Sequence, residues 1–323
     1  MTINEVKSLI REGAELHMAG RIEEAEKKYR DSLKLDNQNA VAHNNLGFLL
    51  MQTGRFDEAE QEYFRAMEIS PKYSTAYSNL GLDYLAMQRT DEAEDYFLKA
   101  ISLNENDFQA CENLAKLYLM KGELTNSEVF WKRCYEIQPH STLLVELSHV
   151  LISQQKLDEA MDVLKNILPD EEENPRVYAM LGIIYFARYD FGSAIKCFKR
   201  ALGMEPENAE VRHNLAMSFL KTGQNADALN EFRRILLLDP NHLEARNNLA
   251  VIELAANETD SALHHFNYTL EQEPGNAKAL YYKSIILFLK GDPDAARKTL
   301  AATVAANHPD YTPKAEEMLA SMN

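Results

Sequence analysis

The feature that most constrains the fold of this chain is a 34-residue period that runs through almost all of its 323 residues. Each copy carries a small residue, a second small residue twelve positions later, and a large apolar residue four positions after that. The first small residues are Gly13, Gly47, Gly81, Ala115, Ser148, Gly182, Ala216, Ala250 and Ser284. The second are Ala25, Ala59, Ala93, Ser127, Ala160, Ala194, Ala228, Ala262 and Ala296, and the large residues are Tyr29, Tyr63, Phe97, Trp131, Leu164, Phe198, Phe232, Phe266 and Leu300.

This spacing has a packing explanation. Two antiparallel helices approach closely only where each presents a small side chain, and a large residue one turn further on fills the groove beside the contact. In five copies a proline follows eight residues after the large residue, where it would end the second helix. Glycines fall between the two expected helices, where a positive φ is easily adopted: Gly20, Gly54, Gly122, Gly223 and Gly291. The pattern predicts an all-α chain of helix–turn–helix units.

The pattern resembles the tetratricopeptide-repeat (TPR) family, whose period is 34 residues. The resemblance implies one right-handed superhelical solenoid over residues 1–323. Its nine repeats would be 6–39, 40–73, 74–107, 108–141, 142–174, 175–208, 209–242, 243–276 and 277–310. A capping helix is expected over 312–322, with Thr312 as its N-cap, because the last repeat of a solenoid needs a cover.

The fifth repeat departs from this regularity. It is one residue short, and its second helix runs into Pro169 and then the four acidic residues 170–173. We expect a local change of superhelical twist there, or a mobile acidic loop.

A groove for a partner is expected on the first helix of each repeat, which lines the concave face in TPR proteins. Five repeats carry asparagine at their sixth position although it is a poor residue for a helix interior: Asn45, Asn79, Asn113, Asn214 and Asn248. An amide offers a donor and an acceptor, which matches a peptide backbone. The arrangement is similar to the asparagine ladder in the TPR domain of O-GlcNAc transferase. The alternative is that these side chains bond the backbone of the neighbouring helix and are a structural feature of this TPR subtype.

Further residues are candidates for the same groove by their repeat positions. They are Asn44, Asn247, Phe48, Met180, Tyr281 and Tyr282. The apolar character of this face suits an amphipathic segment, although burial between repeats also explains such a stripe. The fifth repeat position carries no lysine in any copy, which disfavours the chaperone-tail specificity known in the family.

Composition excludes several functional classes. The formal net charge is −16, and Lys and Arg are scattered among Asp and Glu, so we expect no nucleic-acid partner. No apolar run is long enough to predict membrane insertion. Three cysteines without CxxC spacing predict neither a disulfide framework nor a structural zinc, and we expect a cytoplasmic protein.

The sequence also carries no motif for catalysis or for a cofactor or metal: no P-loop, GxSxG or GxGxxG is present. We therefore predict a non-enzymatic adaptor that binds an extended or amphipathic peptide segment of another protein. The alternative is a structural scaffold that self-assembles into homo-oligomers through repeat ends or the convex face. A third hypothesis is the docking subunit of a separate catalytic protein.

Overall fold

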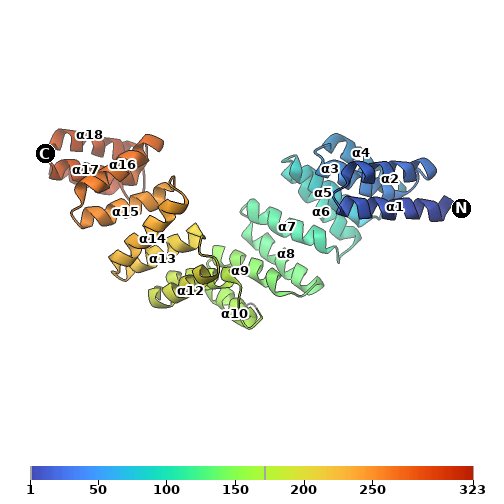
Figure 1. Cartoon of the computed structure of the whole chain (residues 1–323), viewed down its shortest axis with the longest axis horizontal. Coiled ribbons are helices and arrows are strands. Elements are labelled where there is room, and N and C mark those ends of the chain that lie inside the picture. Colours follow the sequence, from blue (N-terminus) through green and yellow to red (C-terminus); the bar gives the residue numbers. More distant parts are fainter. Residues whose placement is uncertain (1, 171, 323) are drawn as a thin grey trace. The chain divides into compact units, whose positions relative to one another are not determined.

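The computed structural model describes residues 2–170 and 172–322, with the side chain of Thr2 left aside, and shows nineteen helices and no strand over that part (Figure 1). The chain divides into two compact units, Met1–Asp170 and Glu171–Asn323, called unit 1 and unit 2. Unit 1 holds α1 (Thr2–Met18), α2 (Ile22–Leu35), α3 (Ala40–Gln52), α4 (Phe56–Ile69), α5 (Ser74–Ala86), α6 (Thr90–Leu103), α7 (Phe108–Met120), α8 (Leu124–Ile137), α9 (Ser141–Ser153) and α10 (Leu157–Ile167).

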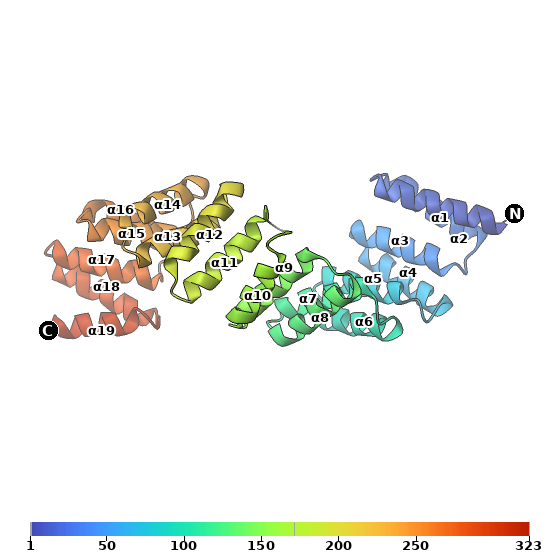
Figure 2. The same ribbon diagram turned by 90° about the horizontal axis from the view of Figure 1, so that it is seen from below.

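Unit 2 holds α11 (Pro175–Ala187), α12 (Phe191–Met204), α13 (Ala209–Lys221), α14 (Asn225–Leu238), α15 (Leu243–Ala255), α16 (Thr259–Gln272), α17 (Ala277–Leu289), α18 (Pro293–Ala305) and α19 (Thr312–Ser321). Each predicted repeat contains one odd-numbered helix, called the A helix, and one even-numbered helix, called the B helix. The expected helix–turn–helix repeats are therefore confirmed, and the view in Figure 2 shows the pairs following one another within each unit.

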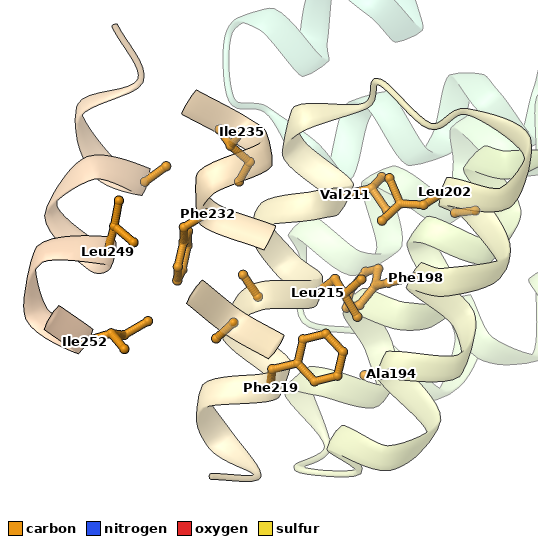
Figure 3. Close-up of a cluster of buried hydrophobic side chains, with 14 residues drawn as sticks. Ala194, Phe198, Leu202, Val211, Leu215, Phe219, Phe232, Ile235, Leu249 and Ile252 are labelled. Carbon is orange, nitrogen blue, oxygen red and sulfur yellow. The ribbon is translucent and has the colours of Figure 1, made fainter. Parts of the chain in front are cut away.

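Within a repeat, the small residue of the A helix packs on the large residue of the B helix, as the sequence predicts. A methyl group added to Gly182 would lie 2.5 Å from Phe198, and one added to Gly47 would lie 2.9 Å from Tyr63. These distances are shorter than van der Waals contact, so glycine is needed for the helices to approach. Figure 3 shows the same layering in unit 2, where Phe198 lies beside Leu215 and Phe232 faces the helix of Leu249.

The turn between the two helices contains a residue with left-handed backbone in all nine repeats. Five of these residues are the predicted glycines, with φ between 73° and 81°. The other four repeats place Gln88, Gln155, Tyr189 and Asn257 there, with φ of 61–63°. The turn geometry is therefore general, and glycine is its usual but not its obligatory occupant.

The capping helix is present as α19, with Ala315 fully buried. The expected N-cap is wrong: Thr312 is the first helical residue, and Tyr311 occupies the cap position. The Thr312 hydroxyl instead accepts a hydrogen bond of 2.9 Å from the backbone N–H of His308, which closes the preceding turn.

The fifth repeat is irregular, as expected. Its B helix, α10, has 11 residues where the other B helices have 13 or 14, and it ends before Pro169, which cannot continue a hydrogen-bonded helix. The division between the units follows at Asp170, and Glu171 of the acidic run lies outside the described residues. One continuous right-handed solenoid over 1–323 stays a prediction.

Candidate peptide-binding surface

The A helices form one wall of each unit. In unit 1, α1 contacts α3, α3 contacts α5 and α5 contacts α7, and in unit 2 the same holds for α11 with α13 and α15 with α17. Helices that meet across successive repeats lie on the inner side of a curved stack. All eleven candidate groove residues are on A helices, and we call this wall the A-helix face.

In unit 1, three of the candidate asparagines bond to one another across α3 and α5. Asn79 Nδ2 donates to Asn44 Oδ1 at 2.9 Å, and Asn44 Nδ2 donates to Asn45 Oδ1 at 3.3 Å. Asn44 is only 4% exposed, whereas Asn45, Asn79 and Phe48 are half-buried. The amide of Asn79 therefore links two repeats.

Asn113 follows the same register without making the same bond. It is 6% exposed, and its Nδ2 has no partner among the described residues. Ser78 stands 35 positions earlier, as Asn44 does relative to Asn79, and the buried Ser78 Oγ also lacks a described partner. The bond between repeats is thus absent where serine replaces asparagine at the fifth position.

In unit 2, a polar network joins the A helices α13, α15 and α17. Asn248 Nδ2 lies 3.2 Å from His213 Nε2, and Asn248 Oδ1 accepts a hydrogen bond from Lys278 Nζ. Asn247, which is 2% exposed, donates to Asn276 Oδ1 at 3.3 Å. The 35-residue step from His213 to Asn248 repeats the step from Asn44 to Asn79.

Burial controls the charges in this network. It lowers the pKa of Lys278, although the nearby Glu244 carboxylate favours the ammonium. It also lowers the pKa of His213, whose Nε2 lies 3.5 Å from Glu244 Oε1. A neutral imidazole nitrogen can accept the hydrogen bond from the Asn248 amide, and the burial of His213 favours that neutral form.

The remaining candidates differ in exposure. Asn214 is half-buried, whereas Met180 is 7% exposed and belongs to the core, so it offers little surface to a ligand. Tyr281 and Tyr282 are half-buried, with ring centres 5.4 Å apart. Tyr311, just before α19, packs on both, at 5.7 and 6.2 Å. Sequence reasoning missed Tyr311, because it assigned that segment only a capping role.

Two other kinds of site, a metal centre and a membrane-spanning helix, were not found among the described residues. Across residues 2–170 and 172–322, no three His, Cys, Asp or Glu side chains are grouped as a metal site would require. No helix in the same ranges combines the length and apolar character that a membrane crossing demands.

Comparisons with known proteins agree with the helix pairs. Family models for the tetratricopeptide repeat match residues 13–54, 38–106 and 253–321. A model of the C-terminal ARM domain of tetratricopeptide repeat protein 21 matches residues 140–256. No curated protein matches the sequence.

The fold is common among solved structures, and 477 chains match it. One is in the crystal structure of the APC/C hetero-tetramer Cut9–Hcn1, with a TM-score of 0.58 and 18% identity. The match covers 86% of this chain and 55% of the other, so the chain spans about half the length of that structural relative. This likeness concerns the fold alone.

Proposed function

The chain belongs to the tetratricopeptide-repeat family, and on that premise we propose that it is a non-enzymatic adaptor whose A-helix face binds an extended or amphipathic segment of another protein. Repeats of this family are protein-interaction modules, so an adaptor or scaffold role follows from the family. The proposal goes further than the family does, because it names the residues that contact the partner and the kind of segment that they bind.

The observation that carries the proposal is the division of the A-helix face into two classes of side chain. Asn44, Asn113, Asn247 and Asn248 are at most 6% exposed. They therefore leave little surface for a ligand, and Asn44 and Asn248 also link successive repeats through hydrogen bonds.

The second class is half-buried on the A-helix face of its own unit: Asn45, Asn79 and Phe48 in unit 1, and Asn214, Tyr281 and Tyr282 in unit 2. Large apolar groups beside amides suit a segment that buries side chains and also needs backbone partners. Phe48 and the two tyrosines would supply the apolar area, and Asn45 and Asn214 the amide contacts.

Photo-crosslinking tests this assignment. We would place a benzoylphenylalanine at Phe48 or at Tyr281, irradiate the chain in lysate from its source cells, and identify adducts by mass spectrometry. Phe64 is the matched control, because it lies on the B helix of the same repeat as Phe48 and is 39% exposed. A reproducible peptide adduct at Phe48 or at Tyr281 is expected, and adducts at Phe64 alone would refute the proposal.

A second arm tests the amides. Asn45→Ala in unit 1 and Asn214→Ala in unit 2, each made alone, should leave the chain folded and bind the peptide identified on that unit about three- to tenfold more weakly, since a hydrogen bond to the peptide is lost. Unchanged affinity would mean that the apolar residues alone hold the ligand.

A further inference from the structure

The turn between α11 and α12 differs from the equivalent turn in every other repeat. Its left-handed residue is Tyr189, with φ 62°, where the other eight repeats have glycine, glutamine or asparagine. The left-handed conformation costs an ordinary side chain about 1–2 kcal/mol, and a bulky aromatic residue is a genuine outlier there. The choice of tyrosine is therefore not explained by the turn itself.

Burial does not explain the choice of tyrosine either. The side chain of Tyr189 is 82% exposed, so folding removes little of its apolar area from water. Its ring centre lies 6.1 Å from that of Phe191, and Phe191 lies 5.2 Å from Phe186. Phe186 and Phe191 are themselves only partly buried. Three aromatic rings thus gather at the surface around one strained residue, and such strain is typical of binding sites.

The charge of this helix pair is opposite to that of the chain. Residues 175–204 contain five Lys or Arg residues and one carboxylate, Asp190, although the chain as a whole carries −16. The even scatter of cations expected from the sequence therefore does not hold here. Asp190 Oδ1 accepts a hydrogen bond of 3.1 Å from the backbone N–H of Ser193 and so caps α12. Lys196 is exposed on the second turn of α12, and the exposed Lys199 lies one turn further on.

We propose that the α11–α12 turn is a docking site for an acidic segment of a partner protein that carries a large apolar residue. Tyr189 contacts the apolar residue, with Phe186 and Phe191 beneath it, and Lys196 attracts the flanking carboxylates. Exposed tyrosines are among the residues that dominate binding energy at interfaces, and complementary charge sets the choice of partner. This surface is separate from the amide contacts assigned to the A-helix face.

The strained backbone at Tyr189 makes it possible to distinguish a loss of binding from a loss of folding. Tyr189→Gly removes the aromatic side chain and relieves the left-handed backbone, so this variant should be more stable than wild type and yet lose binding. We expect the thermal midpoint of this variant to rise by about 2–4 °C. Gln155→Gly is the matched control, because Gln155 occupies the same turn position in unit 1 with φ 63°. Tyr189→Asn is a second variant, since Asn257 shows that asparagine is accommodated in this turn.

The probe is a random library of displayed 12-residue peptides, selected on the full wild-type chain and depleted on the Tyr189→Gly variant. We expect the surviving peptides to be enriched in Asp and Glu with at least one Leu, Ile, Phe or Trp. In fluorescence anisotropy, these peptides should bind the Tyr189→Gly and Tyr189→Asn variants at least about tenfold more weakly than wild type. They should also bind Lys196→Glu more weakly, and they should bind the control Gln155→Gly as tightly as wild type. No surviving peptides, or survivors that are neutral or basic, would overturn the proposal.

Discussion

Asp83 makes the stability of unit 1 depend on pH in an unusual direction. It lies on α5 at a repeat position that is aliphatic in six other A helices: Leu49, Leu117, Val150, Ile184, Ile252 and Ile286. Its side chain is 0% exposed, and neither carboxyl oxygen has a hydrogen-bond partner among the described residues. Burial raises the pKa of Asp83 to about 7, and the carboxylates of Glu60 and Asp57 on α4 add to the rise.

The sign of the effect follows from the two states. In the unfolded chain Asp83 has an ordinary pKa near 3.9, so between about pH 4 and 7 the folded state holds a proton that the unfolded state has lost. Stability therefore falls as pH rises through that window, by about 1.4 kcal/mol per pH unit, and levels off above about pH 7. The full difference is up to about 4 kcal/mol for a shift of about three units.

The perturbation is Asp83→Asn, which removes the titration and keeps the shape. We expect the variant to match wild type near pH 4 and to exceed it progressively up to pH 8. The assay is urea denaturation followed by tryptophan fluorescence, because Trp131 is the single tryptophan, is 2% exposed and lies in unit 1 with Asp83. The contributions of the other carboxyl groups to the free energy of unfolding cancel when variant and wild type are compared at each pH.

Asp95→Asn is the control, since Asp95 is exposed on α6 in the same repeat and loses the same charge. If the stability of Asp83→Asn ran parallel to that of wild type from pH 4 to 8, Asp83 would be solvated or paired in the folded protein. The reasoning from burial would then be refuted.

Five further substitutions test the packing and the polar contacts. Gly182→Ala should lower stability by about 1–3 kcal/mol, because the added methyl group would overpack against Phe198. Gly203→Ala should raise stability by up to about 1 kcal/mol, because the space around its Cβ position is open. Thermal denaturation measures both changes. Asn248→Ala should cost about 1–3 kcal/mol because two buried contacts lose their partner, whereas the half-exposed Asn45→Ala should cost less, again by thermal denaturation. Burial alone would raise the pKa of Glu128, but hydrogen bonds from two lysines and a glutamine lower it to about 2. The stability of the folded chain should therefore fall as pH drops below about 4.5. Glu128→Gln should flatten that fall in acid titrations followed by tryptophan fluorescence.

The contacts within a repeat could be predicted from the sequence because they depend on residues at fixed spacing. Gly182 is 16 positions from Phe198, and the same separation joins Gly47 to Tyr63. A contact that recurs at one offset in nearly every copy appears as a pattern of residue types. The helix pairs, their turns and the capping helix followed from that pattern.

The roles of the asparagines could not be predicted in the same way. Asn79 donates to Asn44, and Asn248 lies beside His213, although the two acceptors are different residue types at the same repeat position. Asn113 faces the same register and makes no such bond. One residue type at one position thus has different partners in different repeats, because the bond depends on the side chain presented by the preceding repeat.

The contacts between repeats also differ in kind between the two units. In unit 1 the same position of four successive B helices is glutamate, and each glutamate accepts hydrogen bonds from the next repeat. Glu26 binds Arg55, Glu60 binds Tyr84, Glu94 binds Tyr118 and Lys121, and Glu128 binds Gln154 and Lys156. In unit 2 the first three B helices hold the apolar Ile195, Leu229 and Leu263 at that position, which pack against the cores, and α18 holds Arg297.

This difference determines how each unit responds to its surroundings. Charge-assisted bonds between repeats weaken when their carboxylates are protonated, whereas apolar contacts do not change with pH. Acid therefore loosens the stacking of unit 1 through Glu94 and Glu128, and a rise of pH from about 4 to 7 destabilises the same unit through Asp83. The groove residues of unit 1 thus rest on a stack with a pH optimum, while the B helices before Tyr281 and Tyr282 carry apolar residues at the position of these glutamates.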